Sequence, residues 1–206
     1  MKPILLVPAL LAMGLAGCGA SGRVETPSNA SPIAALHDAI TALENEPSYS
    51  LTVTDNPGTP SGGPAVYRVN IIEPNRIAIT GALNVIAIGS TAYSRSPTGW
   101  TTFHHSREST NYVNDMLMYI NILKRASSVN RTGDIYNVPA GEAATLLRTT
   151  GLPRFQVATD VSYSATVDGG VIRSVSLHAN GPSSIAATTV VSNIGSSPAV
   201  TAPRSG

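Results

Sequence analysis

The residue with the clearest chemical potential is Cys18, the only cysteine in a chain of 206 residues. A lone cysteine excludes a disulfide within this chain, so its thiol is left for modification. Before it, Lys2 supplies a positive charge, and an apolar run extends from Ile4 to Leu15. This order is typical of a secretory signal, and the run is too short for the ~20 residues of a membrane-spanning helix.

The stretch Leu15-Ala16-Gly17-Cys18 resembles the lipobox of bacterial lipoproteins. The resemblance implies that residues 1–17 are removed as a signal peptide and that Cys18, as the first mature residue, carries a diacylglyceryl group on its thiol. An ordinary secretion signal with an incidental cysteine and a transmembrane anchor are the alternatives. We expect a protein that the acylated Cys18 anchors to the cell membrane on its extracytoplasmic side.

Histidines offer the next candidate chemistry, in the cluster His104, His105 and Glu108. Neighbouring residues of a strand point to opposite faces, so both histidines could hold one metal ion only from a loop, with Glu108 as third ligand. A solvated turn is the alternative, and the one we favour. The sequence lacks a glycine-rich phosphate loop, a His-Glu-x-x-His motif and a Gly-x-Ser-x-Gly motif. We therefore expect no catalytic residues, no enzyme activity, no metal site and no cofactor.

Composition limits the possible partners. Removal of Lys2 with the signal leaves 12 of the 13 basic side chains, against 12 acidic ones, and no cluster of like charge occurs. A nucleic-acid surface needs clustered Lys and Arg, so nucleic acid is not expected as a partner. The low aromatic content of 5% and the charged content of 12%, with many small and β-branched residues, are typical of a β-rich protein.

The elements that follow the signal begin with a tether. Residues 18–31, rich in Gly, Ser, Pro and Asn, predict a flexible link, and residues 32–206 predict one domain. Apolar residues at helical spacing predict a helix over Pro32–Asn45, which Ser31 would cap and Pro47 would end. Alternation then predicts strands at Ser48–Thr54, Ala65–Ile72, Arg76–Thr80, Asn84–Ile88, Thr91–Ser94 and Trp100–Phe103.

The second half of the chain starts with a change of period. Apolar residues at helical spacing predict a helix over Thr110–Ala126, and a shorter one is expected over Pro139–Thr149. Alternation separated by turn residues predicts four more strands, at Asp134–Val138, Phe155–Val167, Val171–Ala179 and Ser183–Ile194. The sum predicts an α+β fold in which about three helices cover one face of a large antiparallel sheet.

The order of elements and several phrases resemble the actinobacterial LppX/LprAFG lipoprotein family, which shares the fold of the lipoprotein carrier LolA. The phrases are Tyr49–Val53, Val85–Gly89 followed by Tyr93 and Gly99-Trp100, Gly133–Val138, Asp168–Arg173 and Gly195–Pro203. The resemblance covers nearly the whole mature chain. It implies a strongly curved antiparallel sheet, an incomplete barrel, with helices on its concave side and a hydrophobic cavity that relatives use for acyl chains.

The resemblance implies an envelope lipoprotein that binds a lipid or other amphiphile and could transfer it, and we expect a monomer. The alternatives are a sensor module that binds protein partners and a structural lipoprotein whose core is filled. Apolar residues expected on the concave side are the candidates for lining a cavity, although the same residues could form a solid core. They are Leu51, Val53, Val69, Ile71, Ile77, Ile79, Ile86, Ile88, Met116, Leu117, Ile120 and Leu147.

Overall fold

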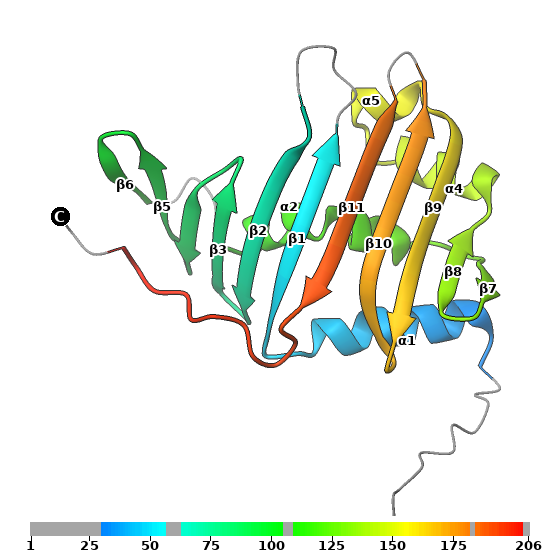
Figure 1. The fold of residues 1–206 in the computed structure, drawn as a ribbon, viewed down its shortest axis with the longest axis horizontal. Coiled ribbons are helices and arrows are strands. Elements are labelled where there is room, and N and C mark those ends of the chain that lie inside the picture. Colours follow the sequence, from blue (N-terminus) through cyan, green and yellow to red (C-terminus); the bar gives the residue numbers. More distant parts are fainter. Residues whose placement is uncertain (1–29, 57–62, 105–108, 182–183, 204–206) are drawn as a thin grey trace, which may run out of the picture.

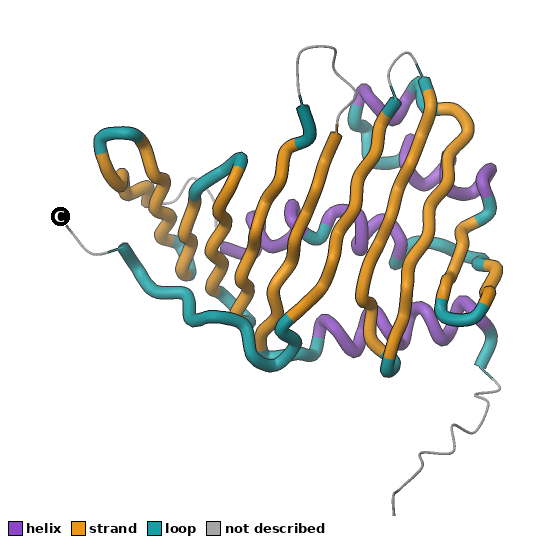
Figure 2. The backbone as a smooth tube through the Cα atoms, viewed as in Figure 1, coloured by secondary structure: helices purple, strands orange, loops and turns teal. Residues whose placement is uncertain are grey.

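The computed structural model describes residues 30–56, 63–104, 109–181 and 184–203. Within them, eleven antiparallel strands form one sheet in the order β6-β5-β4-β3-β2-β1-β11-β10-β9-β8-β7 (Figures 1 and 2). The sheet is open, because β6 and β7 are its two edges. The predicted α+β fold with a large, unclosed antiparallel sheet is confirmed. Cys18 and the predicted signal and tether up to residue 29 lie outside the described residues.

The sheet consists of two meanders joined by the pairing of β1 with β11. The first meander comprises β1 (Ser48–Asn56), β2 (Ala65–Ile72), β3 (Arg76–Gly81), β4 (Val85–Ile88), β5 (Thr91–Ser96) and β6 (Gly99–His104). The second comprises β7 (Asn130–Thr132), β8 (Ile135–Val138), β9 (Thr159–Asp168), β10 (Val171–Asn180) and β11 (Ile185–Ser192). The short strand β7 was not predicted; all the other strands were expected within a few residues.

Five helices lie among the described residues, on one side of the sheet (Figure 1). They are α1 (Pro32–Glu44), α2 (Ser109–Met116), α3 (Met118–Leu123), α4 (Ala140–Arg148) and α5 (Pro153–Gln156). None of the helices in the described part of the chain is both long and apolar enough to cross a membrane.

Helix α1 forms where the sequence predicts it. The Oγ of Ser31 accepts a hydrogen bond from the backbone N–H of Ala34, and Pro32 occupies the first turn, where its missing N–H costs nothing. Leu36, Ile40 and Leu43 recur on one face and are fully buried, so the helix is held by packing against the sheet.

Two predicted elements differ from the structure. The helix expected over Thr110–Ala126 is interrupted at Leu117, so that α2 and α3 run as separate segments. The strand expected from Phe155 begins only at Thr159, because residues 153–156 form α5 with Pro153 in its first turn. Phe155 is fully buried, and its place in the core fixes this short helix.

One hydrophobic core fills the space between the sheet and the helices. Among the described residues, its buried members lie between Leu36 and Val191. Inward-facing residues alternate along each strand: Leu51 of β1, for example, lies between Val69 of β2 and Val191 of β11. This alternation is why period-two apolar spacing in the sequence was enough to predict the sheet.

An ion pair joins the helical layer to the sheet. Arg154 of α5 donates to the Asp55 carboxylate at the end of β1, with Nη1–Oδ distances of 3.0 and 3.3 Å, and to the Tyr119 hydroxyl of α3 at 3.1 Å. The side chains of Arg154 and Asp55 are only 25% and 20% exposed. Charge-assisted hydrogen bonds that are shielded in this way are stronger than exposed ones, so the contact stabilises the position of α5 and α3.

Candidate functional site

Most of the residues predicted to line a cavity lie in the core. Nine of them are buried, and they are brought together on the helix-covered side of the sheet: Leu51, Val53, Val69, Ile71, Ile77, Ile79, Leu117, Ile120 and Leu147. Ile71, Ile77 and Leu147 have no accessible surface, so they border neither solvent nor a void that could hold water. The centre of this face is therefore packed by the chain's own side chains.

The other three candidates are not part of that buried set. Met116 is partly buried and packs against the core from α2. Ile86 and Ile88 lie on the opposite face of the sheet, because β4 pairs so that Ile86 is opposite Ala78 and Tyr93, while Val85 and Ala87 point inward. The expectation that Ile86 and Ile88 share a face with Ile77 and Ile79 is thus corrected by the register of β4.

Open space occurs instead at the β6 end of the sheet, beneath α2. We call it the apolar hollow; its volume is about 350 Å³. Its walls come from the turn before β4, from the inner face of β4, β5 and β6, and from α2. They are formed by Leu83, Val85, Ala92, Tyr93, Ser94, Phe103 and Tyr112. This volume lies within the range of about 300–1,000 Å³ that small-ligand sites occupy.

The strand pairing explains why the hollow exists. Ala92 of β5 lies opposite Ala87 of β4 and Phe103 of β6, so two small side chains are adjacent on the inner face. Ala87 has no accessible surface, whereas Ala92 borders the hollow. Phe103 is 45% exposed, and with Tyr112 it gives the hollow aromatic walls. The Tyr93 side chain lies on the outer face with Ile86, so Ser94 and Tyr112 supply the polar side-chain groups of this lining, and the hollow suits a hydrocarbon chain.

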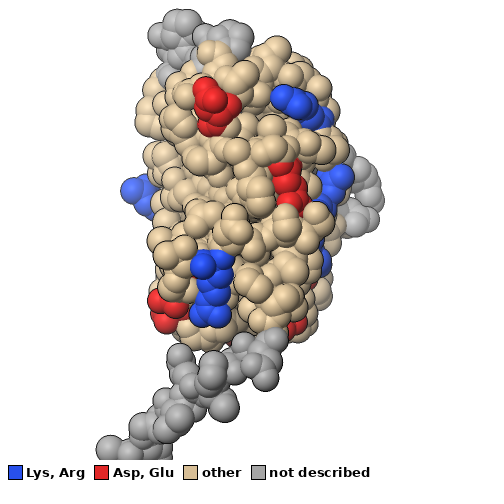
Figure 3. All heavy atoms as spheres, turned by 90° about the vertical axis from the view of Figure 1, so that its right-hand side faces the viewer, with Lys and Arg blue, Asp and Glu red and all other residues tan. Residues whose placement is uncertain are grey.

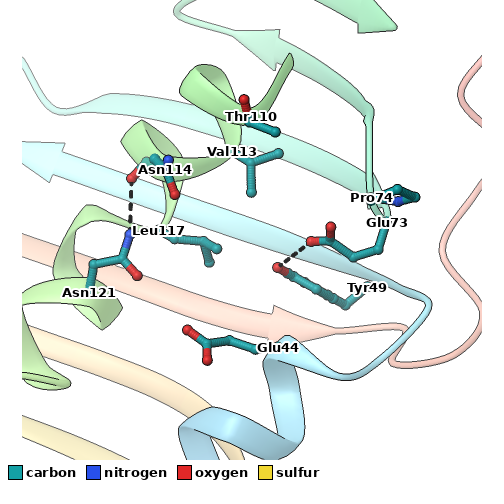
Figure 4. A pocket seen from close by; sticks show the side chains of 9 residues that line it. All are labelled: Glu44, Tyr49, Glu73, Pro74, Thr110, Val113, Asn114, Leu117 and Asn121. Atoms are coloured by element: carbon teal, nitrogen blue, oxygen red, sulfur yellow. Dashed lines mark hydrogen bonds between the residues drawn. The ribbon is translucent and has the colours of Figure 1, made fainter. Parts of the chain in front are cut away.

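A second space, the polar hollow, has a volume of about 300 Å³ and lies between α2, the end of α1, the start of β1 and the β2–β3 turn (Figure 4). Helix α2 contributes to both hollows, through Tyr112 in one and Val113 in the other. Polar side chains dominate its lining, which consists of Glu44, Tyr49, Glu73, Pro74, Thr110, Val113, Asn114, Leu117 and Asn121. Leu117 is the one predicted cavity residue that lines either of the two hollows.

Burial controls the charges of the polar hollow. It raises the pKa of the Glu73 carboxyl above its ordinary value, although a hydrogen bond from the Tyr49 hydroxyl to Oε1, at 3.5 Å, lowers it in part. Burial, together with the nearby Glu73 carboxylate, also raises the pKa of Tyr49, which stays protonated as a donor. Glu44 is paired with Lys124 at 2.8 Å. The polar hollow can thus accept and donate hydrogen bonds beside the apolar side chains of Val113 and Leu117.

Neither hollow contains a constellation of metal ligands or nucleophiles. Across the described ranges, no three His, Cys, Asp or Glu side chains converge as the ligands of a metal ion would. The predicted histidine cluster falls at the end of β6, and residues 105–108 lie outside the described residues. Sequence analysis missed most of the apolar hollow. The signal in the sequence was Phe103, an aromatic residue in a short strand without Asp, Glu, Lys or Arg.

The fold and these hollows define a class: an open antiparallel sheet with helices packed on one face. No family model matches the chain. No curated protein matches it at the level of sequence. Several solved structures, however, are similar to the chain in fold. The chain is similar to LprF from Mycobacterium bovis, with a TM-score of 0.52 and 8% identity over 84% of this chain and 97% of that one.

A second similar structure is the lipoprotein LppX of Mycobacterium tuberculosis, with a TM-score of 0.49 and 10% identity over 82% of this chain and 98% of that chain. At such low identity the likeness to LprF concerns the fold alone. It confirms, at that level, the resemblance to this lipoprotein group that the sequence phrases indicated.

Proposed function

We propose that this protein is an envelope lipoprotein that binds an acyl chain of a lipid or another amphiphile in the apolar hollow. One observation carries the proposal: an open space of about 350 Å³, walled by Leu83, Val85, Ala92, Phe103 and Tyr112, borders a core whose central side chains are fully buried. The shared fold with LprF is consistent with it.

Hydrophobic transfer suffices for such binding. Each methylene removed from water contributes about 0.8 kcal/mol, so about ten buried methylenes supply about 8 kcal/mol, the free energy of micromolar affinity. The proposal therefore needs no catalytic group and no cofactor. Ser94 lies in the same lining and offers its hydroxyl group for a hydrogen bond to a polar end of the ligand.

Membrane attachment belongs to the same proposal. Acylation of Cys18 would hold the domain at the membrane, since two or more acyl chains give stable anchoring where one does not. A chain with Cys18→Ser should leave the membrane fraction of cells and appear in the soluble fraction. Retention of that variant in the membrane would contradict anchoring through Cys18.

The ligand proposal is tested with residues 30–206, which contain every core residue of the described part of the chain. We expect a dansyl-labelled undecanoic acid to bind with a micromolar Kd and an amphiphile to appear in organic extracts of the purified domain. Ser94→Phe places an aromatic ring in the hollow and should weaken binding at least tenfold. The matched control is Ser176→Phe on the exposed outer face of β10, which should bind as the wild type does.

Two outcomes would overturn the proposal. If the wild type binds no fluorescent acid and no amphiphile is extracted, the alternatives of a partner-binding or purely structural lipoprotein replace it. If Ser94→Phe binds as tightly as Ser176→Phe, an amphiphile binds this protein at some other place than the apolar hollow.

A further inference from the structure

Large apolar side chains are exposed together at the β6 end of the sheet. Leu83 and Trp100 are each 37% exposed and Phe103 is 45% exposed. They come from the turn before β4 and from β6, which is an edge strand that pairs only with β5. Trp100 lies on the outer face and Phe103 on the inner face, so the edge itself is apolar on both sides. We call this surface the β6 edge.

The charged side chains of β3–β6 are all basic. No acidic residue occurs from Asn75 to Phe103, whereas Arg76 and Arg95 are both present and exposed. Arg95 is the register partner of Trp100, so a cation and the indole share one face of the hairpin. The opposite end of the molecule carries basic and acidic side chains side by side (Figure 3).

We propose that the β6 edge docks on the surface of an anionic lipid bilayer. Tryptophan and other aromatic side chains favour the boundary between headgroups and hydrocarbon. Each Lys or Arg close to an anionic surface adds a favourable attraction, and Arg95 supplies this charge directly beside Trp100. The unpaired backbone N–H and C=O groups of β6 cannot enter the hydrocarbon core of the bilayer. The β6 edge therefore penetrates no deeper than the headgroup region.

This inference rests on the proposed function, because the β6 edge and the apolar hollow share Leu83 and Phe103. Docking would place the side of the hollow next to lipid, so that an acyl chain could move between bilayer and protein without crossing water. Docking and ligand binding are nevertheless separate measurements, and either can fail alone.

Trp100 is the only tryptophan of the chain, so its fluorescence reports on the β6 edge alone. Residues 30–206 are mixed with vesicles of equal parts phosphatidylglycerol and phosphatidylcholine. We expect a blue shift of the emission and stronger quenching by lipids brominated near the glycerol than by lipids brominated near the chain ends. Vesicles of phosphatidylcholine alone should produce a smaller shift, and salt should reduce it.

Co-sedimentation with the same vesicles tests the residues. Trp100→Ser and Arg95→Gln should each weaken binding about threefold to tenfold. The matched control is Ile135→Ser in β8, near the other edge, where the isoleucine is 46% exposed. It should bind as the wild type does.

Three outcomes would overturn docking. The first is a Trp100 emission that does not change when anionic vesicles are added. The second is an equal loss of vesicle binding in Trp100→Ser and Ile135→Ser. The third is a dimer that forms without vesicles and that Trp100→Ser abolishes, which would make the β6 edge an interface between two copies. Binding of the dansyl acid without vesicle binding would refute docking alone. Vesicle binding without acid binding would support docking and refute the proposed function.

Discussion

Enlarging Ala92 tests directly whether the apolar hollow is unfilled space. Ala92 and Ala87 are register partners on the inner face of neighbouring strands, but only Ala92 borders the hollow. Ala92→Leu adds three carbon atoms, which the hollow can accept, whereas Ala87→Leu forces the same atoms into a site without accessible surface. The two substitutions are chemically identical, so they differ only in the space around them.

The expected energies follow from this difference. Three added carbons could contribute at most ~2.4 kcal/mol, and ordering a leucine side chain costs roughly 0.5–1 kcal/mol, so Ala92→Leu should be neutral or stabilising by about 1 kcal/mol. Ala87→Leu should cost about 1–3 kcal/mol through overpacking. For a domain of this size each kcal/mol corresponds to about 2–4 °C, so the melting temperatures should differ by at least about 2 °C.

The assay is thermal unfolding of both variants of residues 30–206, followed by titration of the dansyl acid into Ala92→Leu. We expect the higher melting temperature and the weaker acid binding in the same variant, Ala92→Leu. A loss of stability equal to that of Ala87→Leu would refute the hollow as open space. Unchanged acid binding in Ala92→Leu would refute it as the ligand site.

Two further predictions concern charged groups. Burial raises the pKa of Glu73, so the folded state binds the carboxyl proton more tightly than the unfolded state. The protonated carboxyl makes its full contribution to the free energy of unfolding below the ordinary pKa of 4.5, and this contribution is lost as the pH rises through the folded pKa. Glu73→Gln should therefore be more stable than the wild type at neutral pH, with a difference that disappears towards pH 4.5 in denaturant titrations; parallel curves would contradict this. A double-mutant cycle of Arg154→Met and Asp55→Asn should give a coupling of about 1–2 kcal/mol in the same titrations, and a coupling below ~0.3 kcal/mol would show that the ion pair does not stabilise α5.

Local patterns in the sequence predict most of the sheet because each strand buries one face. Leu51 and Val53 alternate with threonines, and the period of two leaves no doubt about which side faces the core. β4 is different, because Val85, Ile86, Ala87 and Ile88 are all apolar. If the two larger side chains, Ile86 and Ile88, are assigned to the core, the strand is given the wrong inward face. Its orientation is decided by pairing with β3 and β5, which a local pattern does not contain.

The site was harder to predict than the fold for a related reason. The apolar hollow combines Val85, Ala92 and Phe103 with Tyr112 of α2, so it exists only after β4–β6 and the helix have packed. The residues that were predicted to line a cavity, such as Ile77 and Leu147, are large and aliphatic, and for that reason they fill their own space. A small residue such as Ala92 leaves space, but nothing in its local sequence distinguishes it from Ala87.

The position of the chain's N-terminal segment constrains how the two proposed membrane contacts can coexist. Helix α1 begins at the end of the molecule opposite β6 (Figure 1). Ten strand spacings of ~4.8 Å separate β7 from β6, at most about 48 Å. The thirteen residue steps from Cys18 to Ser31 reach at most about 45 Å, with a root-mean-square span of about 20 Å. A domain standing upright on its β6 edge would therefore stretch this segment to its limit. Acylated Cys18 and the β6 edge can engage one bilayer together only if the long axis of the sheet tilts towards the membrane, which keeps Trp100 and the apolar hollow at the lipid surface.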